Sequence, residues 1–307
     1  MPDACPDLRF SIVTPSLNQA RFLDACLDSV AAQGWPDVEH WVIDGGSTDG
    51  TREILERRKG QLAGFVREPD GGAAEAINKG LARVTGDVVA WLNADDFLLP
   101  GALARVAEAF RAHPDASFVF GNGMRAAEDG ALIEPFFPAP PRFDRRALAE
   151  GLNYVLQPAT FINGATLAQV GPLDAGLRWG FDWDLWLRLS ALAEPVAIDA
   201  TLAASREYEA TLTASGGFPR AEELRRIAER HSGKPMTRGA LCYFLDTLFK
   251  ETGRPQGGLD PRLAPPLIEL WKAVQDFTTE LGTDRAGLPT TTPPPPAPPP
   301  RRGWWRW

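Results

Sequence analysis

Short apolar runs alternate with helical patterns over the first 120 residues, and this alternation is the feature that most constrains the fold. The predicted strands cover residues 10–15, 39–44, 62–67, 87–93 and 117–122. Amphipathic helical patterns lie between them, at residues 21–33, from 51, at 73–84 and after 100. Strands that alternate with helices predict an α/β fold with a mainly parallel central sheet and flanking helices. Ligands bind such sheets beyond the carboxyl ends of the strands.

Composition narrows the class of protein. The chain has 307 residues, of which 44% are hydrophobic, so it can bury a sizeable core. Its net charge of −8 argues against a nucleic-acid partner. The three cysteines are odd in number and widely spaced, which excludes a disulfide framework and indicates a reducing compartment. Because no apolar run is long enough to span a bilayer and no signal peptide is recognisable, we expect a cytoplasmic protein.

The pattern changes twice along the chain. After a mixed region, helical signals dominate residues 219–281 and predict a C-terminal helical appendix. The last part is rich in proline and ends in a basic tryptophan cluster, so it cannot build a core. We therefore expect an α/β domain over residues 1–213, a helical region over 214–286 and a disordered tail over 287–307.

Polar clusters follow the first four predicted strands. They are Thr14-Pro15-Ser16-Leu17-Asn18, Asp44-Gly45-Gly46-Ser47-Thr48-Asp49-Gly50, Glu68-Pro69-Asp70-Gly71-Gly72 and Asn93-Ala94-Asp95-Asp96. Any one of them is ordinary loop composition. Four clusters that converge on one edge of a sheet indicate a ligand site instead.

The residues exclude two common ways of binding a diphosphate. The turn after the first strand, TPSLNQ, has no glycine, so a dinucleotide-binding turn is excluded, and no P-loop sequence is present. The remaining way is a divalent cation held on carboxylates. The segment Asn93-Ala94-Asp95-Asp96 offers the oxygen ligands that Mg²⁺ and Mn²⁺ prefer.

Five motifs carry a resemblance to a known family. SIVTPSLNQ, VIDGGSTDGT, EPDGGAAEAINKG, TGDVVAWLNADD and FDWDLWLRL occur in this order. They resemble the blocks of family 2 glycosyltransferases with the GT-A fold, and the match covers residues 9–213. The resemblance implies a GT-A fold and an inverting, nucleotide-sugar-dependent transfer.

The resemblance also implies roles for residues near the donor. Those that would contact or support the nucleotide are Thr14, Pro15 and Ser16 at the base and ribose, Asp44 at the base (most plausibly uracil), Asp70 beside the nucleoside, and Lys79 with Glu75 and Asn78 on the following helix.

The metal motif of the family reads Asp-x-Asp, whereas this chain has Asn93-Ala94-Asp95. Asp95 is therefore the expected ligand of Mg²⁺ or Mn²⁺, Asn93 a neutral neighbour in the donor site, and Asp96 a residue that orients the loop. Arg206-x-Tyr208 resembles a loop that closes over the diphosphate. Arg206 would supply positive charge to the leaving group, although an ordinary surface arginine is an equal alternative.

Asp182 is the expected catalytic base, because Phe181-Asp182 stands where the family has a Glu-Asp pair. The alternative is a helix N-cap, a position that favours aspartate. Asp184 is interpreted as a first-turn acid that suits the helix dipole. The segment 157–160 resembles an acceptor-side strand, with an ordinary strand start as its alternative.

The predicted function is transfer of a sugar from a nucleotide-sugar, a UDP-sugar, to a saccharide or lipid-linked acceptor hydroxyl, in surface polysaccharide or glycoconjugate synthesis. Two alternatives stay open. A sugar-nucleotide pyrophosphorylase needs a Gly-rich loop that TPSLNQ lacks, and a non-catalytic scaffold would act through its Pro- and Trp-rich tail. Three tryptophans and three arginines between Arg301 and Trp307 are suited to reversible contact with anionic lipid at the inner face of the plasma membrane. A disordered terminus without a role is an equal alternative, and a polyproline ligand for a partner domain is a third.

Overall fold

The computed structural model describes residues 8–138, 141–208 and 216–251. They belong to two compact units. The first unit holds the chain up to Leu148 together with Asn153–Gly216, and the second holds Ala149–Leu152 and the chain from Gly217 on. The predicted tail and residues 252–286 lie outside the described residues.

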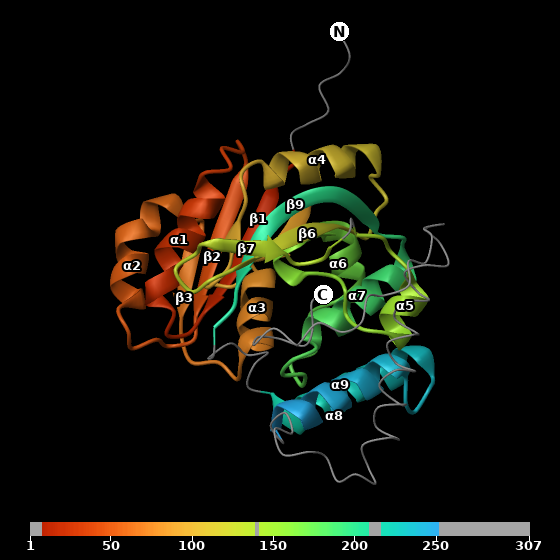
Figure 1. The fold of residues 1–307 in the computed structure, drawn as a ribbon. Helices are drawn as coiled ribbons and strands as arrows, with labels where there is room; N and C mark the ends of the chain where they lie inside the picture. Colours follow the sequence, from red (N-terminus) through yellow and green to blue (C-terminus); the bar gives the residue numbers. More distant parts are fainter. Residues whose placement is uncertain (1–7, 139–140, 209–215, 252–307) are drawn as a thin grey trace. The chain divides into compact units, whose positions relative to one another are not determined.

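One nine-stranded sheet forms the centre of the first unit, in the order β3-β2-β1-β4-β8-β6-β9-β5, with β7 paired to β6 (Figure 1). Its strands are β1 (Phe10–Ser16), β2 (Val38–Asp44), β3 (Gly64–Arg67), β4 (Val88–Trp91), β5 (Phe97–Leu98), β6 (Phe118–Ala126), β7 (Leu132–Pro135), β8 (Thr160–Asn163) and β9 (Val196–Arg206). The helical segments of this unit are α1 (Ala20–Ala31), α2 (Thr51–Arg58), η1 (Lys59–Gln61), α3 (Ala73–Leu81), α4 (Ala102–Ala112), η2 (Gln157–Ala159), α6 (Gly164–Val170) and α7 (Phe181–Leu192), and α5 (Arg145–Glu150) runs across the unit boundary.

The first four strands of the described chain agree with the sequence pattern. Strands β3, β2, β1 and β4 are neighbours and pair in parallel. In their register Ser16 stands beside Asp44, and Asp44 stands beside Arg67. The carboxyl ends of these strands therefore meet at one edge, as the βαβ pattern predicts.

The other half of the sheet is mixed. Strand β8 runs antiparallel to both β4 and β6, β9 is parallel to β6, and β5 is antiparallel to β9. The mainly parallel arrangement thus describes the first half, whereas the complete sheet contains both kinds of pairing.

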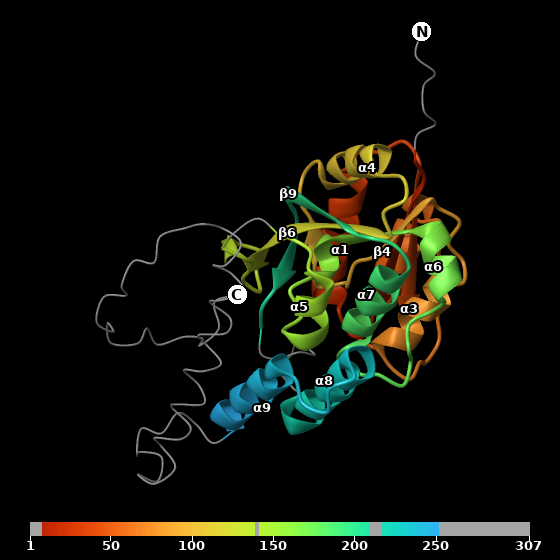
Figure 2. The same cartoon turned by 90° about the vertical axis from the view of Figure 1, so that its right-hand side faces the viewer.

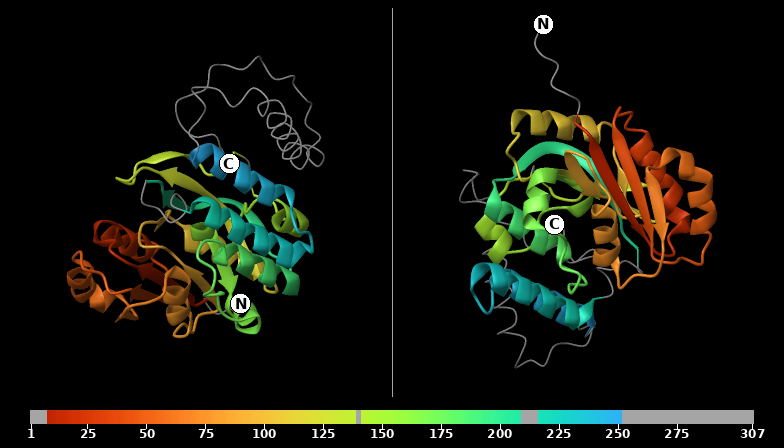
Figure 3. Two further views of the ribbon diagram at one scale, coloured as in Figure 1. Left: turned by 90° about the horizontal axis from the view of Figure 1, so that it is seen from below. Right: turned by 180° about the vertical axis from the view of Figure 1, so that it is seen from behind.

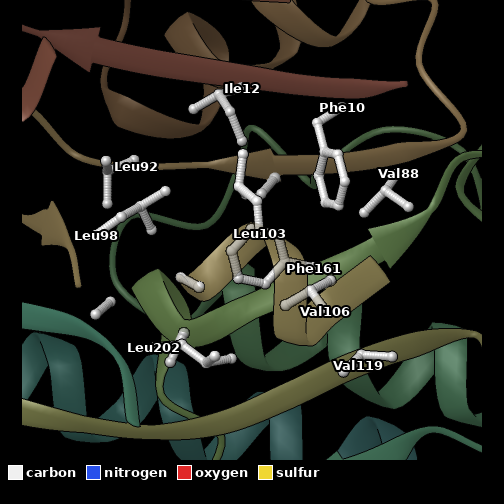
Figure 4. Close-up of a cluster of buried hydrophobic side chains, with 14 of the residues drawn as sticks. Phe10, Ile12, Val88, Leu92, Leu98, Leu103, Val106, Val119, Phe161 and Leu202 are labelled. Atoms are coloured by element: carbon white, nitrogen blue, oxygen red, sulfur yellow. The ribbon is translucent and has the colours of Figure 1, made fainter. Parts of the chain in front are cut away.

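Helices cover both faces of the sheet (Figure 2). On one face Phe10, Ile12, Val88 and Leu92 pack with Leu103 of α4 in a large buried cluster (Figure 4). On the other face α3 comes so close to β1 that a Cβ at Gly80 would lie 2.3 Å from a methyl carbon of Val13.

Helix α7 is fixed to the same face of the sheet by aromatic packing. Trp186 of α7 stacks on Trp91 of β4, with ring centroids 5.3 Å apart and planes 9° apart. Both indoles are fully buried. Since Trp91 ends β4 and Trp186 lies one turn after Asp182, this stack ties the start of α7 to the strand that leads to Asp95.

The second unit contains α8 (Gly217–Ser232) and α9 (Arg238–Glu251), which lie side by side (blue, Figure 3). Leu245 and Cys242 of α9 are buried beside Leu152. Arg225 of α8 donates to the carbonyl oxygen of Pro235 at 2.7 Å, which fixes the loop between the helices. Within the described residues, no helix is both long enough and apolar enough to cross a bilayer.

Candidate functional site

The loops after β1 and β2 hold one another at the carboxyl edge of the sheet. The backbone N–H of Asn18 donates to Ser47 Oγ at 2.8 Å, and the N–H of Thr48 donates to Asn18 Oδ1 at 2.9 Å. Asp49 accepts from the N–H of Ala20, the first residue of α1, at 2.8 Å. A carboxylate at a helix N-terminus satisfies a free N–H and complements the helix dipole. These hydrogen bonds therefore order the carboxyl edge of the sheet without a ligand.

Asp44 is fully buried at the end of β2. Its Oδ1 accepts hydrogen bonds from the N–H and the hydroxyl of Ser47, and its Oδ2 accepts from Arg67 Nε at 2.9 Å. A buried carboxylate needs such partners because desolvation of an unpaired charge is costly. Asp44 is thus placed where the donor site was predicted, with its charge already balanced.

The predicted residues of β1 lie at the same edge, but they differ in what their side chains reach. Thr14 is buried, and its hydroxyl lies 2.8 Å from His40 Nε2. Burial lowers the pKa of His40 to about 4, so this imidazole is neutral at physiological pH. Pro15 is also buried, whereas Ser16 Oγ is a buried hydroxyl for which the described residues provide no hydrogen-bond partner. Of the three, Ser16 offers a ligand a free polar atom.

Asp70 reaches across to the end of β2. A Cβ at Gly45 would lie only 2.7 Å from Asp70 Oδ2, so the close approach requires a glycine there. Lys79 of α3 donates to the carbonyl oxygen of Pro69 at 3.0 Å and pairs with Glu68 and Glu75 at 3.1 and 3.3 Å. Lys79 therefore holds the loop that carries Asp70, in line with the supporting role expected for it.

The segment after β4 turns its two aspartates in different directions. Asp96 is buried, and its carboxylate accepts from the N–H of Arg206 at 3.2 Å and from Asn93 Nδ2 at 3.2 Å. Burial, with the charge of Asp95 as a smaller cause, raises the pKa of Asp96 well above its usual range. Asp95 is only half-buried. The structure thus places Asp95 where a ligand can reach it and Asp96 inside the loop.

Residues at the end of β9 cover the Asp95 loop. The guanidinium of Arg206 is buried between the rings of Phe22 and Phe97, at 5.0 and 4.7 Å from their centroids, and it donates to the carbonyl oxygen of Asp95. The hydroxyl of Tyr208 donates to Asp95 Oδ2 at 2.7 Å. In this structure Arg206 supports the loop from within and is not a surface arginine. Its contact with a diphosphate stays a prediction.

Asp182 lies in the first turn of α7 and is half-buried. The N-cap of this helix is Gly180, so the cap alternative does not describe Asp182. Its Oδ1 accepts from the N–H of Trp183 at 2.7 Å, and its Oδ2 lies 3.4 Å from Asn153 Nδ2. Asp184, in contrast, is buried and pairs with Arg188 Nε at 2.7 Å. The two acids of this turn are therefore distinct, one accessible and one structural.

Two side-chain bridges connect the β1–β4 edge to the segment that carries Asp182. Asn78 of α3 donates to the carbonyl oxygen of Leu173 and accepts from its N–H, both at 2.9 Å. Gln157 Nε2 donates to the carbonyl oxygen of Trp91 at 2.7 Å, and Gln157 Oε1 accepts from Asn93 Nδ2 at 3.1 Å. Gln157 begins η2 and Thr160 begins β8, so the segment 157–160 is a 3₁₀ turn that enters a strand at its last residue.

The donor set fits a hard divalent cation that is completed by a ligand. Within the described ranges, no group of three or more His, Cys, Asp or Glu side chains could hold a metal by itself. Asp95 provides one accessible carboxylate, and Asn93 Oδ1 is an amide oxygen beside it. Mg²⁺ is commonly bound through one or two carboxylates together with substrate phosphates. Asp95 with a diphosphate satisfies that rule.

Sequence reasoning missed Arg67 and the bridging role of Gln157. Arg67 follows from register, because it ends β3 directly beside Asp44 and opposite charges on neighbouring strands attract. Gln157 has no such signal. It lies 66 residues from Trp91, so only the folded chain brings the two together.

Comparison with known proteins gives a consistent result. The model of glycosyl transferase family 2 matches residues 11–161. An uncharacterized glycosyltransferase of Mycobacterium tuberculosis is 31% identical over 229 residues, which cover 73% of this chain and 85% of the relative. A PGL/p-HBAD biosynthesis glycosyltransferase of Mycobacterium bovis is 34% identical over 183 residues, 58% of this chain and 68% of the relative.

Solved structures share the fold. Staphylococcus aureus TarS in complex with UDP-GlcNAc superposes with a TM-score of 0.59 at 19% identity, covering 87% of this chain and 80% of that chain. The mannosyltransferase PcManGT of Pyrobaculum calidifontis, in complex with GDP-Man and Mn²⁺, gives a TM-score of 0.59 at 18% identity, covering 91% and 87%. The fold of this chain is thus the GT-A fold that its motifs predict.

Proposed function

The chain belongs to glycosyltransferase family 2, and from this premise we propose that it transfers a sugar from a UDP-sugar to the hydroxyl of a saccharide or lipid-linked acceptor, with inversion. The observation that carries the proposal is the convergence of Asp44, Asp70 and Asp95 at the carboxyl edge of β1–β4. Sheets of this class bind their ligands at that edge.

The donor would bind across the ends of β1 and β2. Ser16 Oγ, a buried atom without a partner among the described residues, would meet the nucleoside once the neighbouring loop moves, and Asp70 lies beside the end of β2. Asp44 has no exposed surface, so a base can reach its carboxylate only if the neighbouring loop moves. Leu17, which is 53% exposed, lies beside Gly45, the residue that follows Asp44, so its loop is the part that would have to shift.

Mg²⁺ or Mn²⁺ is the proposed cofactor, with Asp95 as its ligand from this chain. Bound beside a diphosphate, such an ion supplies positive charge that balances the negative charge of the leaving group. The complex of PcManGT with GDP-Man and Mn²⁺ supports a divalent cation at this kind of site. Tyr208 holds Asp95 in place until the ligand arrives.

Asp182 is the proposed base. It would take the proton of the acceptor hydroxyl as that oxygen attacks the anomeric carbon from the side opposite the diphosphate. Asn153 Nδ2, at 3.4 Å, is the neighbour that orients one of its oxygens. With one carboxylate as base and no protein nucleophile in the scheme, the sugar carbon inverts in a single displacement.

The acceptor class is the least constrained part of the proposal. The names of two relatives, a PGL/p-HBAD biosynthesis glycosyltransferase and the O-antigen biosynthesis protein RfbC of Myxococcus xanthus, support a role in glycoconjugate synthesis. A lipid-linked acceptor agrees with the tryptophan- and arginine-rich terminus predicted to touch the inner membrane surface, which lies outside the described residues. Family membership stands against the pyrophosphorylase and scaffold alternatives.

A panel of UDP- and GDP-sugars tests the donor. The full chain with Mn²⁺ should hydrolyse one UDP-sugar faster than the others, and Asp95→Asn should lose this reaction while its circular dichroism spectrum is unchanged. Hydrolysis of a GDP-sugar alone would contradict the UDP assignment. No hydrolysis and no binding of any nucleotide would contradict the function itself.

Co-sedimentation with anionic vesicles tests the membrane contact. The full chain should partition with the vesicles, whereas a chain that ends at Leu288 should stay in solution and keep its donor hydrolysis. Equal partitioning of the two chains would show that the terminus does not bind the vesicles.

A further inference from the structure

The orientation of the Gln157 side chain follows from its partners. The carbonyl oxygen of Trp91 can only accept, so the nitrogen of Gln157 must face it, at 2.7 Å. This leaves Gln157 Oε1 directed at Asn93, whose side-chain nitrogen lies 3.1 Å away. The choice between the two ends of each amide is therefore determined by one backbone carbonyl.

The same reasoning determines the orientation of Asn93. Its nitrogen has two N–H groups, and they point to Gln157 Oε1 and to Asp96 Oδ2 at 3.2 Å. With both donors used, the oxygen of the planar amide lies on the other side. Within the described part of the chain, Asn93 Oδ1 has no hydrogen-bond partner, and the residue is half-buried next to Asp95.

We infer that Gln157 is a positioning residue for donor binding, which holds the amide of Asn93 so that Oδ1 is presented to the donor as an acceptor. The inference rests on the proposed function and deepens it. The group that Oδ1 would meet carries positive charge or an O–H, which means the divalent cation or a hydroxyl of the ribose.

This arrangement also accounts for asparagine in place of the usual first aspartate of the metal motif. A carboxylate at position 93 has no N–H to give, so it would lose the two hydrogen bonds that Asn93 donates, to Gln157 Oε1 and to Asp96 Oδ2. Turning the Gln157 amide round would leave its oxygen against the carbonyl oxygen of Trp91. The hydrogen bond between these two side chains therefore requires asparagine at position 93 together with glutamine at position 157.

Calorimetric binding of UDP, with Mn²⁺ and separately in EDTA, tests the inference, and GDP is titrated in parallel. Gln157→Met keeps the length of the side chain and removes both hydrogen bonds. We expect it to weaken nucleotide binding about tenfold, the usual worth of one well-placed hydrogen bond to a ligand. A loss seen with and without Mn²⁺ assigns Oδ1 to the ribose, and a loss seen only with Mn²⁺ assigns it to the cation.

Gln33→Met is the matched control. Gln33 also donates to backbone carbonyls, those of Ser29 and Leu99 at 3.0 Å, but it does not contact Asn93. It should reduce the melting temperature to a similar extent and leave UDP affinity unchanged. If both glutamine variants weaken binding equally, the effect of Gln157 is general destabilisation and the inference is wrong.

A double-mutant cycle with Asn93→Ala separates a role through Asn93 from an independent one. In the Asn93→Ala background, Gln157→Met should cause no further loss of affinity. Additive losses would overturn the inference and leave the proposed function intact. If the wild-type chain binds neither nucleotide, the proposed function falls and this inference falls with it.

Asn93→Asp keeps the inference testable should Gln157→Met fail to fold. It adds a carboxylate beside the cation site, yet we expect Mn²⁺-dependent UDP binding to weaken, because the new side chain cannot donate to Gln157. Equal or tighter binding would show that Gln157 does not orient position 93.

Discussion

The two halves of the candidate site hold their carboxylates in different ways. At the ends of β1–β4, Asp44 is fully buried, with both oxygens bonded to Ser47 and Arg67. Around η2 and α7, Asp182 is half-buried, and its contact with Asn153 is long, at 3.4 Å. The carboxylate of the first half is enclosed by protein partners, whereas that of the second half is partly exposed.

This difference suits the two tasks. A binding surface gains from groups that are fixed before the ligand arrives, because less order has to be created on binding. A general base has to exchange a proton with its substrate and therefore needs a carboxylate that the substrate can reach, which a partly exposed side chain provides. The comparison predicts that mutations in the first half change stability and affinity, whereas those in the second half change turnover.

The largest expected effect is on turnover. Asp182→Asn keeps the size of the side chain and removes its basicity, so the rate of sugar transfer should fall about a hundredfold or more. The dissociation constant for the donor should change less than twofold, about the scatter of such measurements, because Asp182 belongs to the other half of the site. Transfer at near the wild-type rate would show that another group is the base.

The second prediction concerns the buried charge at the end of β2. Arg67→Met should lower the free energy of unfolding by about 2–3 kcal/mol, because Asp44 keeps its burial and loses its cation. Arg57→Met is the control, since its pair with Asp24 is exposed and should contribute less than about 1 kcal/mol. Urea denaturation of both variants checks the difference. Equal losses of unfolding free energy would mean that the buried pair of Arg67 and Asp44 stabilises the fold no more than an exposed ion pair does.

The third prediction uses His40, which burial keeps neutral in the folded chain with a pKa of about 4. In the unfolded chain histidine titrates near pH 6.5, so protons bind preferentially to the unfolded state as the pH falls from 6.5 towards 4. The free energy of unfolding should therefore drop by about 2 kcal/mol between pH 7 and pH 5. His40→Gln should flatten this part of the profile, and an unchanged slope would contradict the assignment.

The smallest expected effect tests a bridge between the two halves. Asn78→Ala removes both hydrogen bonds to the backbone of Leu173, at a cost of about 1 kcal/mol in stability. Turnover should fall more than donor affinity, because the segment that leads to α7 loses its fixed position. If only the affinity for the donor falls, Asn78 supports the donor site and does not position the segment that leads to α7.

The sequence predicts the two halves of the sheet to different extents. Strands β1–β4 follow from apolar runs, and the expected helices at 21–33 and 73–84 are found as Ala20–Ala31 and Ala73–Leu81. Strand β5 has only two residues, too few for a pattern, and the four residues of β7 are mostly exposed and so lack the buried face that marks a strand. They exist because β9 and β6 offer them partners.

The same division applies to the predicted site. The positions of Asp44, Asp95 and Asp182 follow from motifs, because each lies at the end of a strand or the start of a helix. The partners of these residues do not, since Tyr208 reaches Asp95 across 113 residues and Gln157 reaches Asn93 across 64. Contacts of this range depend on the complete topology. The expected contact between Arg206 and the diphosphate illustrates the limit, because the sequence cannot show that Phe22 and Phe97 enclose its guanidinium.

Calorimetry of UDP binding to the full chain and to Asp95→Asn, with and without Mn²⁺, tests the central claim most directly. Asp95 is the accessible carboxylate of its loop, and its removal leaves Asp96 buried among protein partners. We predict that Mn²⁺ strengthens UDP binding by the wild-type chain and has no effect on the variant. An equal effect of Mn²⁺ on both proteins would contradict the assignment of Asp95 as the residue through which this chain holds the cation and its donor.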